Sequence, residues 1–82
     1  MELKQIQYFE LIYKHKSISK AASELYMSQQ GVSKQIASLE AELNAPLFRR
    51  TSRGVELTEE GQYFHEQAAI IQQIQQNITD HF

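Results

Sequence analysis

The stretch that decides the fold is ISKAASELYMSQQGVSKQIASLEAEL, residues 18 to 43. Ser17 and Ser28 are good N-caps, and after each cap the apolar residues recur at helical spacing. Only Tyr26 and Met27 lie between the first helical segment and the second cap, too little chain for two helices packed flush and antiparallel. We therefore expect two helices that cross steeply, as in a helix-turn-helix.

The second of these helices begins with residues that suit a core badly. Gln29 and Gln30 carry long amides, and Gly31 costs about 1 kcal/mol against alanine inside a helix. A helix-turn-helix places the first turns of its second helix at the major groove of DNA. A glutamine amide both donates and accepts, so it can pair with adenine N6 and N7. The pattern favours base contacts, although any one of these side chains alone fits an ordinary solvated face.

Further polar residues extend this candidate surface. Ser33 can donate to a phosphate, and Lys34 can reach a phosphate or a guanine. Ser28 is foremost a structural cap, but a capped helix N-terminus also presents backbone N–H groups to a phosphate. Lys20, near the start of the first helix of the pair, lies where backbone contacts are common and equally fits a solvent-facing position.

The flanking sequence predicts three more elements. Residues 2–15 form an amphipathic helix, and the segment LFRRTSRGVEL at 47–57 predicts a β-hairpin with strands over 47–50 and 55–57. Thr58 then caps a helix that runs to near the end. The expected fold is mainly α: a winged helix-turn-helix of three helices plus a β-hairpin wing, followed by a long linker helix. We divide it into a DNA-binding domain, 1–58, and a dimerisation helix, 59–82.

Three arginines surround the tip of the hairpin. Arg53 is expected near the minor groove or the flanking phosphates, where narrow A·T-rich stretches favour arginine. Arg49 and Arg50 have two interpretations, contact with DNA or an ion pair with Glu40 or Glu42. We favour the ion pair for Arg49 and include Arg50 with Arg53 among the candidate DNA contacts.

The charge is divided along the chain. The first 55 residues contain all eight basic residues and five acids, whereas residues 56–82 contain five acids and no Lys or Arg. Eighty-two residues allow one small domain, and the lack of cysteine excludes disulfides and thiolate metal sites. The N-terminus lacks the apolar core of a secretory signal, and no apolar run approaches the length of a membrane span. We expect a soluble, cytoplasmic protein.

The last helix carries an apolar stripe at heptad-like spacing. A core-packing stripe is the usual explanation, but this one continues after a compact unit of this size should be complete. We therefore expect it to pair with a second copy of the chain. The expected dimer contacts are Phe64, Ala68, Ile71, Ile74 and Ile78.

The segment AASELYMSQQGVSKQIASLEAELNAPLFRRTSRGVELTEEG resembles the N-terminal winged helix-turn-helix of LysR-type transcriptional regulators, and MELKQIQYFELI fits the first helix of that family. The resemblance covers residues 1 to about 65. It implies a homodimer on an imperfect inverted repeat of double-stranded DNA, with a tetramer possible in a longer protein. It also implies an effector-binding C-terminal domain that these residues do not include. By motif position, Gln29, Gln30, Ser33, Lys34 and Arg53 inherit DNA contacts. Many members carry proline where this chain has Gln30 and arginine where it has Lys34, and lysine lacks the bidentate fork with which arginine reads a base.

Two other classes of function compete with this interpretation. A winged-helix module that binds protein without any DNA role is the main alternative, and the basic wing and polar second helix speak against it. An enzyme has little support, because His15, His65 and His81 show no metal-ligand spacing and no serine lies in a nucleophile motif. These histidines are expected at the surface or at helix ends. We predict no catalytic residue, no metal and no cofactor.

Overall fold

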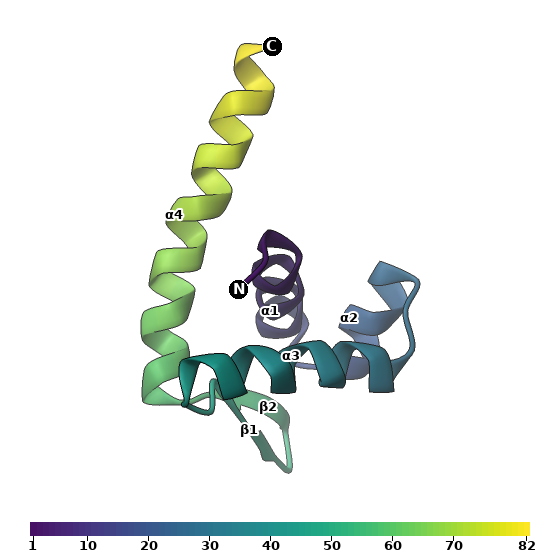
Figure 1. The fold of residues 1–82 in the computed structure, drawn as a ribbon. Coiled ribbons are helices and arrows are strands. Elements are labelled where there is room, and N and C mark those ends of the chain that lie inside the picture. The colour runs from purple at the N-terminus through teal and green to yellow at the C-terminus, as the bar shows by residue number, and fades with distance from the viewer.

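The computed structural model describes all 82 residues, and its elements follow the predicted order. The helices and strands are α1 (Leu3–His15), α2 (Ile18–Leu25), α3 (Gln29–Leu43), β1 (Phe48–Thr51), β2 (Gly54–Leu57) and α4 (Glu59–His81). We call α1 to β2 the head. Figure 1 shows α3 crossing below α1 and α2, the hairpin beneath it, and α4 rising past the head. The expectation of a mainly α winged helix-turn-helix with a long last helix is confirmed.

The predicted caps begin three of the helices. The hydroxyl oxygens of Ser17, Ser28 and Thr58 accept hydrogen bonds from the backbone N–H groups of Lys20, Gly31 and Gly61, at 3.1, 3.0 and 3.0 Å. The way in which the first three helices end was not predicted from the sequence. Lys16, Tyr26 and Asn44 adopt left-handed conformations with φ of 52°, 56° and 54°, at positions where glycine is common. These tight endings give the short connections that bring α1, α2 and α3 together.

The core lies where the three short helices meet the hairpin. Phe9 is at its centre, with its ring centroid 4.7 Å from that of Phe48 and 4.5 Å from that of Phe64. The buried cluster comprises Phe9, Ile12, Ala21, Ala22, Val32, Ile36, Leu39, Leu47 and Val55. The two adjacent alanines remove bulk from α2, so that neighbouring helices approach it closely. The helix-turn-helix is therefore held by α1 and the hairpin together.

The two strands pair antiparallel, with Phe48 opposite Leu57 and Thr51 opposite Gly54. β1 is shifted by one residue from the predicted 47–50, and β2 begins one residue before the predicted 55–57. Leu47 lies outside β1 because its N–H donates to the carboxylate of Glu40 at 2.6 Å, and its side chain is buried in the core. The Glu40 carboxylate also accepts from the N–H of Phe48 at 3.3 Å. The end of α3 thus fixes where the wing begins.

The first part of α4 packs on the head and includes two of the expected dimer contacts. The Phe64 ring packs against the Phe9 ring at a tilt of 60°, and Ala68 is only 1% exposed within the single chain. Both side chains therefore contribute to packing within the single chain, Ala68 buried and Phe64 half-buried, because α4 completes the core. Their part in a dimer stays a prediction. After Ala68 no residue of α4 is buried. The functional division at residue 58 stays a prediction, and packing continues across it.

None of the four helices combines the length and apolar character that crossing a bilayer requires.

Candidate nucleic-acid interface

The start of α3 forms an exposed polar surface. Gln29, Gln30 and Lys34 are exposed, and Ser33 is half-buried. Gln29, Gln30 and Ser33 line a shallow groove of about 450 Å³. Ser28 spends its hydroxyl oxygen on the cap, so the remaining backbone N–H groups of the first turn face outward without a side-chain acceptor. This end of α3 offers amide groups and a partial positive charge.

A second cleft, of about 470 Å³, opens beside it between three elements. The end of α1, the start of α2 and the hairpin form its walls, and Gln29 of α3 lies at its border. Four cationic residues line it: Lys16, Lys20, Arg50 and Arg53. No Asp or Glu lines the cleft, and none of the four makes an ion pair within the chain. A concave surface with uncompensated cations attracts an anionic ligand.

The wing is fixed to this cleft by its backbone. The N–H of Val55 donates to the carbonyl of Lys16 at 3.2 Å, which ties β2 to the turn between α1 and α2. Gly54 has φ of 117°, and a Cβ there would lie 2.5 Å from the same carbonyl oxygen. Only glycine permits this approach. The hairpin therefore holds Arg53 at a defined place beside the cleft.

The ion pairs differ from those that the sequence indicated. Arg49 Nε lies 3.7 Å from Glu56 Oε2 across the hairpin, and neither Arg49 nor Arg50 pairs with Glu40 or Glu42. Glu40 is already bound to the backbone after α3, and Glu42 holds the amino group of Met1 at 2.8 Å. The predicted pair of Arg49 with Glu40 or Glu42 is therefore wrong, and Arg49 pairs with Glu56 instead. Arg50 stays exposed beside Arg53.

The structure brings together four of the eight candidate DNA contacts in the cleft, namely Lys20, Gln29, Arg50 and Arg53. Gln30 and Ser33 lie in the neighbouring groove, whereas Ser28 and Lys34 line neither. Lys16, which also lines the cleft, was not among the predicted contacts. Its Nζ lies 5.1 Å from the centroid of the Tyr13 ring, on which it rests at the rim of the cleft. The available signal was its position just before the Ser17 cap.

One histidine lies where the sequence did not place it. His15 and His81 are at helix ends as expected, but His65 is in the middle of the packed part of α4. Its ring stacks on Tyr13 at 4.1 Å between centroids, and its Nδ1 is 2.8 Å from Glu10 Oε1. His65 is drawn inward because α1 supplies both an aromatic face and a carboxylate.

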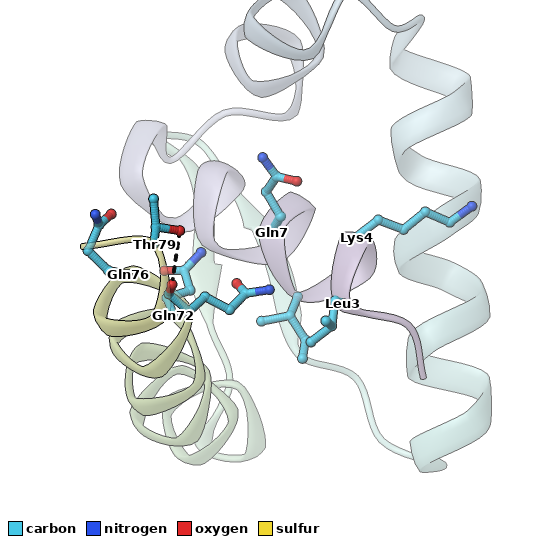
Figure 2. A pocket seen from close by; sticks show the side chains of 8 residues that line it. Leu3, Lys4, Gln7, Gln72, Gln76 and Thr79 are labelled. Carbon is cyan, nitrogen blue, oxygen red and sulfur yellow. Dashed lines mark hydrogen bonds between the residues drawn. The ribbon is translucent and has the colours of Figure 1, made fainter. Parts of the chain in front are cut away.

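A third hollow, of about 500 Å³, lies at the opposite end, between the start of α1 and the later part of α4. Figure 2 shows Gln72 extending from α4 toward Leu3. Four of its eight lining residues are glutamines, and this polar hollow contains none of the candidate DNA contacts.

The later part of α4 also carries an exposed apolar face. Ile70, Ile74 and Ile78 are 56%, 52% and 58% exposed. Ile70 belongs with Ile74 and Ile78 because residues four apart share a helix face.

Comparison with known proteins agrees with this geometry. The model of the family described as "Bacterial regulatory helix-turn-helix protein, lysR family" matches residues 3–62. The transcriptional regulator BudR of Klebsiella aerogenes is 46% identical over 71 residues, which are 87% of this chain and 50% of that protein. CzcR of Bacillus subtilis is 48% identical over 61 residues, 74% of this chain and 21% of that protein. The matched part of this chain thus spans half the length of BudR and 21% of the length of CzcR.

Two solved structures have the same arrangement as the whole chain. The DNA-binding domain of CbnR in complex with DNA superimposes with a TM-score of 0.88 at 34% identity, covering 99% of this chain and 93% of that one. The DNA-binding domain of BenM with its catB site 1 DNA gives 0.86 at 36% identity, covering 96% and 90%. The fold, the position of the wing and the family match point in one direction. The chain belongs to the LysR family of bacterial regulatory helix-turn-helix proteins.

Proposed function

We propose that these 82 residues are the sequence-specific DNA-binding part of a transcriptional regulator, which acts as a dimer on an imperfect inverted repeat. The main support for this proposal is the cleft, which is lined by four unpaired cations and no acid. The glutamine-rich start of α3 lies at its border. Phosphates supply the anionic ligand that such a surface attracts, and base edges suit the amides beside it. CbnR and BenM, whose domains superimpose on this chain, are described in complex with DNA.

In this proposal α3 enters the major groove with its first turns. Gln29 and Gln30 are exposed there and pair with base edges, adenine being the partner that a bidentate amide fits best. Ser33 and Lys34 contact the sugar-phosphate backbone, since a lysine lacks the bidentate fork of arginine. Ser28 contributes through the helix end that it caps, whose N–H groups favour a phosphate.

The wing and the start of α2 hold the flanking backbone. Arg53 and Arg50 come from the hairpin and Lys20 from α2, and Lys16 joins them from the end of α1. Contacts of this kind set the position and orientation of a protein on the duplex and carry no sequence information of their own. They make the affinity depend on salt, because each neutralised phosphate releases counterions.

The second half of α4 supplies the dimer contact of the proposal. Ile74 and Ile78 are more than half exposed, and Ile70 and the half-buried Ile71 extend their stripe. An apolar stripe of this length on an exposed helix marks an interaction surface. Residues 59–82 contain acids and no Lys or Arg, so this helix is not attracted to phosphate. Pairing it with a second copy keeps it off the DNA and joins two heads.

The same proposal assigns the remaining properties. The role is regulatory and not catalytic, as it is for the relatives named above. We place the protein in the cytoplasm, together with the DNA that it binds. Response to a small-molecule effector, and assembly beyond a dimer, belong to parts of a longer protein.

The test begins with selection of bound sites from a pool of random duplexes. Binding of the selected site and of a random duplex is then measured over a range of salt concentrations. Gln29→Ala should weaken the selected site by about 1 to 3 kcal/mol and leave the random duplex nearly unchanged, because it removes a base contact. Arg53→Ala should weaken both and make the salt dependence shallower by about one unit.

Gln67→Ala is the matched control, because Gln67 is an exposed glutamine on α4, outside both clefts. It should leave both affinities unchanged. Equal losses on the selected and random duplexes for Gln29→Ala would remove its role in reading bases. An absence of any salt-dependent binding by the wild-type chain would favour the alternative, a winged-helix module that binds protein.

A further inference from the structure

The first part of α4 is attached to the head at three levels. At its start, the Thr58 N–H donates to the carbonyl of Leu47 at 3.0 Å, and the Thr58 hydroxyl donates to the carbonyl of Pro46 at 2.6 Å. Nearly two turns further, Phe64 packs on Phe9. Next to Phe64, the His65 ring meets Glu10 and Tyr13 of α1. Beyond Ala68 the helix has no buried residue.

These levels constrain α4 in different ways. Apolar contacts such as Phe64 on Phe9 hold α4 near the head but tolerate small changes in its tilt better than a short hydrogen bond does. A hydrogen bond between well-aligned groups is directional. His65 Nδ1 and Glu10 Oε1 are 2.8 Å apart, with side chains that are only 23% and 13% exposed. The Tyr13 ring covers one face of the imidazole and restricts its rotation. This is the last directional contact before α4 leaves the head.

We propose that Glu10, Tyr13 and His65 form a positioning cluster that fixes the direction of α4, and thereby the separation of half-sites that a dimer of this chain accepts. The half-sites and the dimer come from the proposed function, on which this inference rests. None of the three residues lines the cleft or groove assigned to DNA. Their effect is therefore on geometry, through α4, and not on contact with a base or phosphate.

The part of α4 beyond the cluster is long, so a small change in its direction displaces the expected dimer contacts by several ångströms. From His65 to Ile78 the helix rises roughly 20 Å at about 1.5 Å per residue. A tilt of about 10° at His65 would move Ile78 by about 3 to 4 Å, close to the ~3.4 Å rise of one base pair. In a symmetric dimer the displacement occurs on both sides. Adding one base pair also rotates a half-site by roughly 35° around the duplex, so a wrong separation misaligns the second head.

The first experiment measures separation directly. Duplexes carry two copies of the selected half-site with the spacer varied one base pair at a time. The wild-type chain should prefer one spacer by about 10²-fold or more over the others, because the gain from double attachment is lost when geometry forbids it. His65→Ala should reduce that preference below about tenfold while its affinity for a single half-site stays within about twofold.

Two further variants sharpen this experiment. Glu66→Ala is the control, because Glu66 is an exposed neighbour on the same helix, and it should keep the wild-type preference. Glu10→Gln retains an oxygen and the side-chain shape, so it should keep most of the preference. If His65→Ala does not fold, His65→Leu fills the same space without the hydrogen bond and should show the same loss. A folded variant without the His65 hydrogen bond that keeps the full spacer preference would overturn the proposal.

A second experiment needs no DNA. The chain has no cysteine, so cysteines introduced at Ser38 on α3 and Asn77 on α4 carry the only spin labels. Labelled chains are diluted with unlabelled chains to suppress distances between protomers. His65→Ala should broaden or shift the distance distribution, and Glu66→Ala should not. An unchanged distribution in His65→Ala would overturn the cluster. A wild-type chain without spacer preference would instead overturn the dimeric function, while this measurement still decides the role of the cluster.

Discussion

The two halves of α4 are one continuous helix, yet they meet different surroundings. From Glu59 to Ala68 the helix packs on the head, with Gly61 and Ala68 buried. From Ala69 to His81 it has no buried residue and carries exposed isoleucines among glutamines. In Figure 1 this second half extends away from the head to the C-terminus. Helical periodicity alone makes the two halves look alike. What separates them is whether the rest of the chain reaches far enough to cover the apolar face, and for Ile70, Ile74 and Ile78 it does not.

The largest effect should come from breaking the second half. We expect Ile74→Asp combined with Ile78→Asp to lower the affinity for a full inverted repeat by about 10² to 10⁴-fold, because attachment of the second head becomes intermolecular. Both side chains are more than half exposed in the single chain, so the head should keep its free energy of unfolding. Sedimentation and titration of full and half-sites provide the measurement.

Glu59→Ala with Glu60→Ala serves as a comparison, since it changes two charges on exposed residues of the packed half. It should leave the sedimentation of the chain unchanged. A double aspartate variant that still sediments as a dimer and binds the full repeat as tightly as the wild type would place the interface elsewhere.

Substitutions in the first half of α4 should lower the stability of the fold. A Cβ on Gly61 would lie 2.0 Å from the carbonyl oxygen of Leu47 and 3.0 Å from its carbonyl carbon. Both atoms are backbone and cannot turn aside. We expect Gly61→Ala to lower the free energy of unfolding by about 3 kcal/mol or to push α4 off the loop before β1. Urea unfolding measures the loss.

Gly31→Ala is the matched control, because Gly31 is also a helical glycine, and its nearest atom, Ser28 Oγ, lies 3.1 Å from the built Cβ. It should change stability by no more than about 1 kcal/mol in either direction. Equal losses for the two alanine variants would show that helix propensity, and not the approach of Leu47, explains the glycine at position 61.

A smaller loss is expected where the first half begins. Thr58→Ala removes the cap of Gly61 and the hydrogen bond to Pro46, and should cost about 1 to 2 kcal/mol in the free energy of unfolding. Thr58→Ser keeps a hydroxyl and should restore most of it. Thr58→Ala with wild-type stability would mean that the backbone bond to Leu47 suffices to anchor the helix.

The sequence predicts features that depend on neighbouring residues better than features that depend on residues far apart in the chain. The caps at Ser17, Ser28 and Thr58 are local, and each was predictable from a few neighbouring residues. Phe64 was assigned to the dimer because its partner, Phe9, is distant in the sequence. The burial of Gln5 also depends on a distant partner, because its amide faces Gln35 on α3. Periodicity shows which face of a helix is apolar but not which surface covers it.

The candidate site divides in the same way. The amides at the start of α3 stood out because they are poor choices for that position in a core helix. Lys16 did not stand out, since its place at the cleft depends on the left-handed turn after α1 and on the wing that binds its carbonyl. Its position just before the Ser17 cap marks the end of a helix, but it indicates neither the left-handed turn nor the contact with the wing, because Lys16 is not the glycine that usually ends a helix this way.

The smallest effect should come from the hydrogen bonds of the second half. Gln76 Nε2 donates to Asp80 Oδ1 at 2.7 Å, one turn along an exposed face. Such pairs stabilise a helix by about 0.2 to 0.5 kcal/mol, and alanine recovers part of this through its better helix propensity. We therefore expect Gln76→Ala to leave the urea midpoint nearly unchanged, in contrast to Thr58→Ala on the same helix. Gln73→Ala, which removes the equivalent bond to Asn77, should behave alike. A loss from Gln76→Ala as large as that from Thr58→Ala would show that the second half is also held to the head, and the two halves would no longer differ.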